Sequence, residues 1–287
     1  MREPLRFAGK VMSATVSRTA DRWFVSILVE TSDPRPIKLK SDGSQRRSAA
    51  LLPETARHAG VGVDLGLLHL VVTSAGVFYE APKPLKAVLK KLRRSQRSQA
   101  RKLIAGRRAK PDDKRYRSKN WLKGNKRLSK LHARVASVRL DFIHKMTTDL
   151  CRENQAIGVE DLNVAGMLKN RCLSRSISDV AWGEILRQLQ YKAVIYGTRL
   201  VVADRFFPSS KTCSSCRAVK KTLALSEREF VCECGLEIDR DLNAALNLYP
   251  GLLGNQRLRT GRIGTSQEEQ PSLVEAGTRP CALVRTS

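Results

Sequence analysis

Acidic residues are scarce in this chain of 287 residues: 27 aspartates and glutamates stand against 53 lysines and arginines, and the formal net charge is +26. So large an excess of one sign repels itself unless counter-charges neutralise it, which favours a polyanionic partner such as DNA or RNA over a merely basic protein. The sequence also has no apolar run of about 18 residues and no apolar segment after Met1, so we expect no membrane partner and no secretory signal.

The cysteines do not follow the disulfide-rich pattern of small secreted proteins. Of seven cysteines, three are scattered through the chain and four lie close together. This usage predicts a metal site, and the cytoplasm is the expected compartment. The scattered residues are Cys151, Cys172 and Cys281, and the clustered ones are Cys213, Cys216, Cys232 and Cys234.

The clustered cysteines form two knuckles, Cys213-Ser-Ser-Cys216 and Cys232-Glu-Cys234-Gly, separated by a loop whose apolar residues alternate as in a small hairpin. Four thiolates in so short a stretch predict a closed, tetrahedral, structural Zn²⁺ site. The second knuckle has one intervening residue instead of two, which tightens the loop at Cys234. Arg217 also follows the first knuckle, at a position where glycine is common.

The order of apolar segments predicts an α/β protein with one mixed sheet. Strands are expected at 60–66, 68–73, 77–80, 156–162 and 200–203, after an N-terminal hairpin at 11–18 and 23–30 and a loop at 31–59. Apolar spacings of three and four predict a helix over 126–152. Ser178 and Asp179 are expected to cap a helix that ends at Gly197, and a last helix is expected before Pro250. Three strands followed by alternating helices and strands is also the RNase H-like (RuvC) order.

Carboxylates interrupt the predicted strands where structure alone does not explain them. Asp64 lies within an apolar strand, Glu160 ends another, and Asp239 and Asp241 lie at the start of the last helix. A buried carboxylate without a partner is costly, so a bound cation is expected. Three carboxylates could hold two Mg²⁺ or Mn²⁺ ions about 4 Å apart, with one activating water and the other stabilising the leaving oxygen of a phosphodiester. Asp64, Glu160 and Asp241 are the predicted set, and Asp239 is the alternative to Asp241.

A basic segment at 83–127 separates the first three core strands from the long helix. Its density of lysine and arginine predicts helical arms along a phosphate channel, and a solvated charged face or a disordered segment is the alternative. The candidate nucleic-acid-binding residues are Lys90, Arg94, Arg97, Arg101, Arg107, Arg108 and Lys211.

Four motifs in one order carry a resemblance to a known family: Gly-Val-Asp-Leu-Gly at 62–66, Val-Glu-Asp-Leu-Asn-Val at 159–164, Phe-Pro-Ser-Ser-Lys-Thr-Cys-Ser-Ser-Cys at 207–216 and Asp-Arg-Asp-Leu-Asn-Ala-Ala at 239–245. Over about residues 10–250 the chain resembles the TnpB (OrfB) proteins of insertion sequences, relatives of the type V CRISPR nucleases. The resemblance implies an RNA-guided DNA endonuclease with one RuvC site, a guide RNA from the transposon end and a DNA target. It also implies that Asp64, Glu160 and Asp241 are catalytic and that the four clustered cysteines bind zinc.

The resemblance implies a division of the chain into a wedge β-barrel remnant plus basic loop at 1–59, a RuvC-like core at 60–208 with the basic insertion at 83–127, a zinc ribbon at 209–237, a last RuvC helix at 238–252 and a disordered tail at 253–287. Family members usually begin upstream with a helical recognition lobe, so a shortened N-terminus is expected. Three functions follow as hypotheses: an active Mg²⁺-dependent endonuclease, a cleavage-deficient guide-RNA- or DNA-binding regulator or inert transposon fragment, and a zinc-ribbon RNA-binding structural protein.

Overall fold

Two compact units make up the protein, of which a computed structural model describes residues 5, 8–32, 37–39, 45–47, 57–110, 112–113, 116–224, 226–253 and 273–276. The first unit comprises Met1–Ala50, Lys83–Leu140 and Gln267–Ser287, and the second comprises Leu51–Pro82 and Asp141–Ser266. The sheet, the clustered cysteines and the last helix therefore share one unit, whereas the basic insertion is grouped with the N-terminal hairpin. In the part of the chain that is described, no helix is long and apolar enough to cross a membrane.

The first unit contains the predicted N-terminal hairpin, formed by β1 (Lys10–Thr19) and β2 (Arg22–Glu30) around a turn at Ala20 and Asp21. A short strand, β12 (Leu273–Ala276), pairs with β2, although the sequence predicts no structure in that segment. Two further strands, β3 (Ile37–Leu39) and β4 (Gln45–Arg47), pair where a loop is predicted. Apart from β12, the predicted disordered tail beyond 253, Cys281 included, lies outside the described residues.

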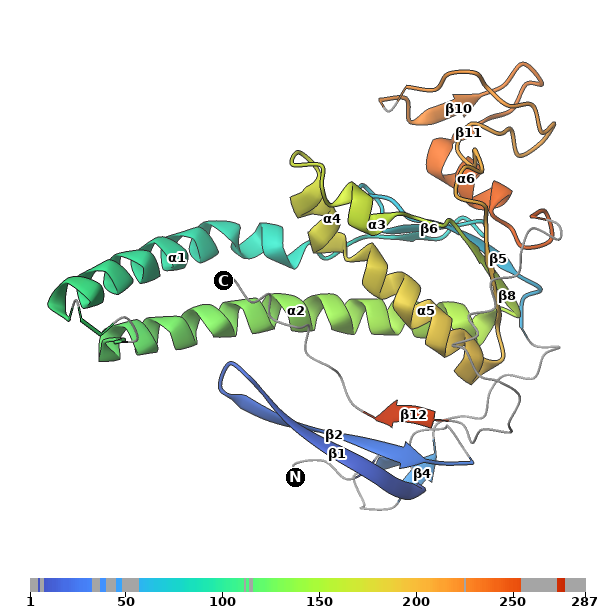
Figure 1. The fold of residues 1–287 in the computed structure, drawn as a ribbon. Coiled ribbons are helices and arrows are strands. Elements are labelled where there is room, and N and C mark those ends of the chain that lie inside the picture. The colour runs from blue at the N-terminus through green and yellow to red at the C-terminus, as the bar shows by residue number, and fades with distance from the viewer. Residues whose placement is uncertain are drawn as a thin grey trace. The chain divides into compact units, whose positions relative to one another are not determined.

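The basic insertion folds as the helix α1 (Pro84–Ala109) and the first part of α2 (Lys119–Glu153), which Figure 1 shows as two long helices joined by a short connection. Pro84 occupies the first turn of α1, where the missing N–H removes no helical hydrogen bond. The helix predicted from 126 begins earlier, at Lys119, because lysine and arginine are good helix formers and do not end a helix. Between the two helices, Gln99 Nε2 of α1 donates a hydrogen bond to the Trp121 carbonyl of α2 at 3.0 Å.

The second unit is built on a five-stranded mixed sheet in the order β7-β6-β5-β8-β9, which confirms the predicted α/β class. The strands β5 (Val61–Asp64), β6 (Val71–Thr73) and β7 (Phe78–Tyr79) form an antiparallel meander. The strands β8 (Ala156–Val159) and β9 (Arg199–Val202) then run parallel to β5. This arrangement places the carboxyl ends of β5 and β8 at the same edge of the sheet.

One face of the sheet packs on the helices that the apolar periodicity predicts. Val63 and Ile157 join Met146 of α2 and Leu189 of α5 (Trp182–Tyr196) in the main core. Alternation along a strand turns the neighbours of Val63 and Ile157 to the opposite face. That opposite face receives α6 (Arg240–Asn247), the predicted last helix.

The prediction that Ser178 and Asp179 cap a single helix is wrong. Both residues lie within α4 (Ser174–Val180), and Ala181 separates α4 from α5 with a left-handed backbone at φ 55°. Alanine has no side-chain oxygen to cap a helix, so this break carries none of the usual sequence signals. The predicted end of α5 is confirmed, because Gly197 is its C-cap at φ 63°.

Candidate functional site

A pair of glycines brings α6 onto the sheet. Gly62 of β5 and Gly158 of β8 are register partners in adjacent parallel strands. A Cβ atom built on Gly62 would lie 2.0 Å from the Ala245 carbonyl oxygen, and one on Gly158 would lie 1.8 Å from that of Leu248. Only residues without a side chain allow the helix backbone to approach so closely. The two glycines thus fix where α6 begins relative to the strand ends.

The predicted carboxylates converge at this place. Asp64 comes two residues after Gly62, and Glu160 comes two residues after Gly158. Because residues two apart along a strand share a face, both carboxylates lie on the side of the sheet that α6 covers. Asp241 lies in the first turn of α6, and a Cβ atom built on Gly66, just beyond β5, would lie 4.0 Å from its Oδ2 atom. The structure therefore brings Asp64, Glu160 and Asp241 into one neighbourhood.

Electrostatics set Asp64 apart from an ordinary surface carboxylate. Burial, and then the charges of Glu160 and Asp241, raise the pKa of Asp64 well above its usual range, and Arg240 opposes that rise in part. Burial also raises the pKa of Glu160, against a hydrogen bond from Ser209 that lowers it. Partly buried carboxylates that lie close together repel one another, and a bound cation can offset that repulsion.

Ser209 is a contributor that the sequence reading did not identify. Its hydroxyl donates a hydrogen bond to Oε1 of Glu160, although 49 residues separate the two in the chain. Ser209 is itself buried and lies in the segment after β9 that leads to the cysteines. The bond fixes one oxygen of Glu160 and leaves the other for a ligand.

Asp239 and Asp241 have different partners. The Asp239 side chain is the N-cap of α6 and accepts hydrogen bonds from the backbone N–H groups of Asp241 at 3.0 Å and Leu242 at 2.9 Å. The Asp241 carboxylate instead accepts from the Arg240 guanidinium at 3.2 Å. Asp239 is thus occupied in capping, which favours Asp241 as the third ligand of a metal site.

Oxygen ligands of this kind suit Mg²⁺ or Mn²⁺, and three carboxylates facing one Arg240 leave an excess of negative charge for such ions. The three carboxylates are not close enough together to share a single ion. Among the His, Cys, Asp and Glu residues that the structure describes, only the four clustered cysteines form such a group of three or more. A pair of ions about 4 Å apart needs a wider spread of ligands than a single ion does. The arrangement of these carboxylates is therefore compatible with a pair of cations.

The four clustered cysteines fit a single tetrahedral ion. All four Sγ atoms lie within 4.8 Å of one another, with Cys213 and Cys234 at 3.7 Å and Cys216 and Cys232 at 3.6 Å. A tetrahedral zinc–thiolate site with bonds of about 2.3 Å has sulfur atoms roughly 3.8 Å apart. Cys234 belongs to this set despite the short second knuckle.

Both knuckles close by equivalent hydrogen bonds. The Arg217 N–H donates to the Cys213 carbonyl at 3.1 Å, and the Gly235 N–H donates to the Cys232 carbonyl at 3.0 Å. Arg217 and Gly235 both have left-handed backbones, with φ of 65° and 89°. The left-handed residue comes four positions after Cys213 in the first knuckle but three positions after Cys232 in the second. The second knuckle therefore closes with one residue fewer between its cysteines. The hydrogen bond from Arg217 Nη1 to Oδ1 of Asn247, at 2.8 Å, offsets the cost of a left-handed backbone at a residue other than glycine.

Two asparagines connect the cysteine cluster to α6, and the sequence reading missed both. Asn243 and Asn247 are 0% exposed. Their Nδ2 atoms both donate to the Thr212 carbonyl at 2.7 Å, and Asn247 also donates to the Ser209 carbonyl at 2.9 Å. Oδ1 of Asn243 accepts from the Ser214 N–H at 3.0 Å. The first cysteine knuckle is therefore hydrogen-bonded to the helix that carries Asp241. Their spacing of four residues on one helix face is the signal that could have revealed them.

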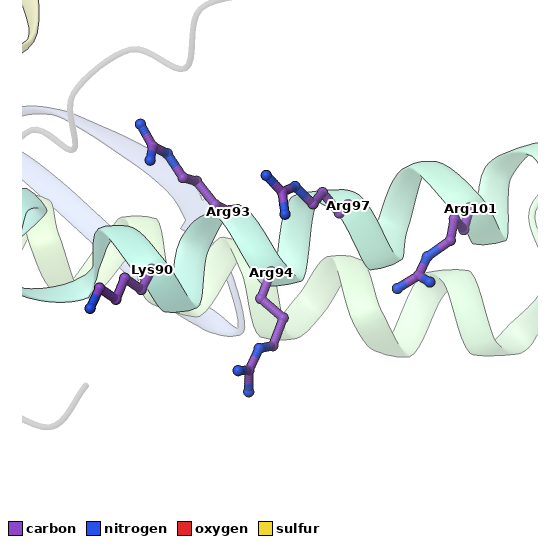
Figure 2. A pocket seen from close by; sticks show the side chains of 5 residues that line it. All are labelled: Lys90, Arg93, Arg94, Arg97 and Arg101. Atoms are coloured by element: carbon purple, nitrogen blue, oxygen red, sulfur yellow. The ribbon is translucent and has the colours of Figure 1, made fainter.

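The basic side chains of α1 form a separate surface. Figure 2 shows Lys90, Arg93, Arg94, Arg97 and Arg101 extending from successive turns of this helix around one shallow pocket, which no acidic residue lines. Four of the five are predicted nucleic-acid-binding residues, and Arg93 is an addition. Arg107 and Arg108 lie in the last turn of α1, where cations also stabilise the helix dipole. Lys211 belongs to the other unit, and its Nζ donates to the Lys221 carbonyl at 3.4 Å.

The second unit is thus a mixed α/β sheet with partly buried carboxylates at the ends of its strands and a four-cysteine cluster attached to its last helix. The chain belongs to the OrfB_IS605 family, described as probable transposase, whose profile matches residues 26–171. A second profile, the Cas12f1-like TNB domain, matches residues 182–248.

Several curated proteins are similar in sequence to this chain over most of its length. One named "Putative RNA-guided DNA endonuclease" from Streptomyces pristinaespiralis is 39% identical over 93% of this chain and 62% of its own length. The protein of the same description named InsQ, from Escherichia coli K12, is 29% identical over 96% of this chain and 65% of its own length. A Mycobacterium tuberculosis relative, Rv2885c, is 36% identical over 83% of this chain and 48% of its own length. The chain thus spans about half to two thirds of the length of these relatives.

Two solved structures also align with the chain. A Cas12f1–sgRNA–target DNA complex gives a TM-score of 0.44 at 15% identity and covers 85% of this chain and 68% of its own. A CRISPR-Cas12f ternary complex gives a TM-score of 0.46 at 19% identity and covers 78% of this chain and 44% of its own.

Proposed function

We propose that this chain is a divalent-cation-dependent endonuclease of the RNase H-like (RuvC) class that cuts DNA under the direction of a guide RNA. The convergence of Asp64, Glu160 and Asp241 at the start of α6 carries the proposal, because partly buried carboxylates that lie close together are otherwise unfavourable. The RNA and DNA partners rest on the family and on the names of the relatives.

In this proposal each side chain has a separate task at the phosphodiester. Two Mg²⁺ ions, when bound, would supply an activated water and stabilise the leaving oxygen. Asp64 would contribute negative charge to the metal site, since both Glu160 and Asp241 lie within electrostatic reach of it. Glu160 would offer its free oxygen while Ser209 holds the other. Arg240 would hold the Asp241 carboxylate in place.

Zinc is the ion that we propose for the four cysteines, in a structural role. The sulfur spacing and the complete set of four thiolates leave no open position for a substrate or water. The hydrogen bonds from Asn243 and Asn247 support a role in holding α6 rather than in chemistry.

The proposal is tested by incubating the purified full chain with labelled single- and double-stranded DNA, with and without co-expressed RNA, in Mg²⁺ and in EDTA. Cleavage that requires Mg²⁺ and disappears in the Asp64→Ala, Glu160→Ala and Asp241→Ala variants is the expected result. These variants should still bind nucleic acid, because the carboxylates repel phosphate. DNA binding without cleavage under every condition would instead support the function of a cleavage-deficient regulator.

A further inference from the structure

An exposed aromatic side chain lies in the turn after β9, between two residues that hydrogen-bond to the acidic end of β8. Phe206 is 87% exposed, the largest fraction among the large apolar side chains for which exposure is determined. Its neighbour Phe207 is partly buried against Val201 and Leu248 in the smaller core cluster. Phe207 therefore anchors this segment, and Phe206 contributes nothing to that core. Single exposed apolar residues are ordinary, so the inference depends on where Phe206 lies and on how rigidly it is held.

The turn that carries Phe206 is attached on both sides to the acidic end of β8. Before it, the Arg205 guanidinium donates to Oδ2 of Asp161 at 3.0 Å. After it, the Ser209 hydroxyl donates to Glu160. Phe206 thus lies between two residues that hold consecutive carboxylates, and one of these is a predicted metal ligand.

The backbone of the turn is fixed as well. The Phe206 N–H donates to Oδ1 of Asp204 at 2.9 Å, and the Phe207 N–H donates to the Asp204 carbonyl at 3.0 Å. A side chain displayed on a locked turn loses little conformational freedom when it binds, which makes a rigid aromatic ring an efficient contact.

We propose that Phe206 is a stacking platform for one nucleobase of the strand that enters the carboxylate site. This inference rests on the proposed function, which places a nucleic-acid strand at Glu160. An aromatic face binds any base, because every base has a π-face, and it requires the base to be unstacked from its neighbours. The platform would favour single-stranded or locally opened DNA over an intact duplex. It would also position the adjacent phosphate, so Phe206 is a positioning residue and not a catalytic one.

The test is a binding cycle in the full-length chain carrying Asp64→Asn, so that the probe is not consumed. The probe is a short fluorescent single-stranded DNA, and a series of such probes carries one abasic position moved along the strand. Phe206→Ala should weaken binding by about fivefold to 150-fold, the range of one base–aromatic stack. Phe206→Trp should bind at least as tightly as the parent, and Phe206→Leu, which keeps apolar area without a ring, should resemble Phe206→Ala.

The abasic probes identify the partner of the ring. One abasic position should weaken binding by the parent chain by the same factor as Phe206→Ala, and should have no further effect on that variant. Val194→Ala is the matched control, because Val194 is 78% exposed on α5 and should not affect binding. An abasic penalty that is unchanged in Phe206→Ala, or a Phe206→Leu variant that binds like the parent, would overturn the proposal. Because the experiment measures binding, an abasic penalty that disappears in Phe206→Ala would support the platform even if the wild-type chain never cleaves DNA. If the chain cleaves DNA but the penalty is unchanged in Phe206→Ala, the platform is rejected and the proposed nuclease function is not.

Discussion

Asp64 is a residue at which stability and the proposed function oppose each other. Its pKa is raised by burial and by the charges of Glu160 and Asp241. An acid whose pKa is higher in the folded than in the unfolded state stabilises the fold at low pH, and this contribution is lost as the pH rises through the folded-state pKa. The metal-free protein should therefore lose stability as the pH rises from about 4, where the unfolded carboxyl titrates, up to the raised pKa of the folded state, and this loss should level off above it.

Asp64→Asn should make the metal-free protein more stable at pH 7 while abolishing cleavage. The amide keeps the shape and cannot ionise, and each 1 kcal/mol gained should raise Tm by about 2–4 °C for a chain of this size. Added Mg²⁺ should raise the Tm of the wild type but not of the variant. Thermal denaturation with and without Mg²⁺ measures both effects. Asp141→Asn, which removes an exposed carboxylate paired with Lys145 at 2.7 Å, is the control that should change neither.

Asp239 and Asp241 should be separable by substitution. Asp241→Asn should abolish cleavage with little change in stability, because it removes a proposed metal ligand. Asp239→Ala should reduce stability by about 1 kcal/mol and lower cleavage only partly, since it removes the cap of α6. Asp239→Ser, whose hydroxyl can still cap α6, should retain most of the stability and most of the cleavage rate. Urea denaturation and cleavage rates are the measurements, and loss of activity in Asp239→Ala but not in Asp241→Asn would reverse the assignment.

Asp64 and Glu160 could be proposed from the sequence because a carboxylate within or at the end of an apolar strand conflicts with its surroundings. It predicted Asp241 and kept Asp239 as the alternative, because both suit a helix start. The hydrogen bonds that distinguish them depend on where the first turn of α6 lies against the sheet. Ser209 was missed for a similar reason, because its partner Glu160 is 49 residues away and serine is common in loops.

At the scale of elements, the contact between α6 and the sheet should be sensitive to single methyl groups. Gly62→Ala and Gly158→Ala each place a carbon within about 2 Å of a backbone oxygen, so α6 must move. We expect each to lower the free energy of unfolding by about 1–3 kcal/mol or more and to reduce cleavage as Asp241 is displaced. Gly183→Ala is the control, since nothing lies within 4 Å of its added carbon in α5. Calorimetry that finds all three variants equally stable would contradict the close-approach argument.

The cysteine cluster should control the carboxylate site through α6. We expect about one zinc ion per chain. Because a structural zinc site contributes folding free energy, Cys213→Ser should lower both the Tm and the rate of cleavage in excess Mg²⁺. Asn247→Leu should keep zinc yet reduce both quantities, since it leaves buried carbonyls of Ser209 and Thr212 with fewer donors. Cys172→Ser, an exposed cysteine outside the cluster, is the control. Metal analysis that finds no zinc in chelator-free preparations would refute the zinc assignment.

Helices and strands with strong periodicity were predictable, whereas the breaks between them were not. The sheet and the end of α5 at Gly197 followed from apolar runs and from glycine's freedom at positive φ. The break at Ala181 did not, because alanine disfavours the left-handed region and only tertiary packing of α4 and α5 can hold it there. The strand β12 was equally unpredictable, since its partner β2 lies more than 200 residues earlier in the sequence.

At the scale of the whole chain, the net charge of +26 implies that phosphate contacts dominate affinity. The cations are spread over both units, with a basic stretch on α1 and Lys211 in the unit that carries the carboxylates. Contacts of this kind position a nucleic acid without reading its bases. We therefore expect binding that discriminates little between sequences and that falls steeply as salt increases.

Salt titrations can assign the α1 cations to that interaction. Replacing Arg94, Arg97 and Arg101 together by glutamine should lower the slope of log K against log salt by about 2 on single-stranded DNA, because each neutralised phosphate contributes roughly 0.7. Affinity should fall alike for all sequences, and cleavage of single strands should fall with it. Arg187→Gln should leave the slope unchanged, since that guanidinium is held by Glu184 at 2.7 Å and 2.8 Å. A triple variant with weaker binding but an unchanged slope would mean that these arginines contact bases or protein rather than phosphate, and α1 would then contribute to specificity instead of general attraction.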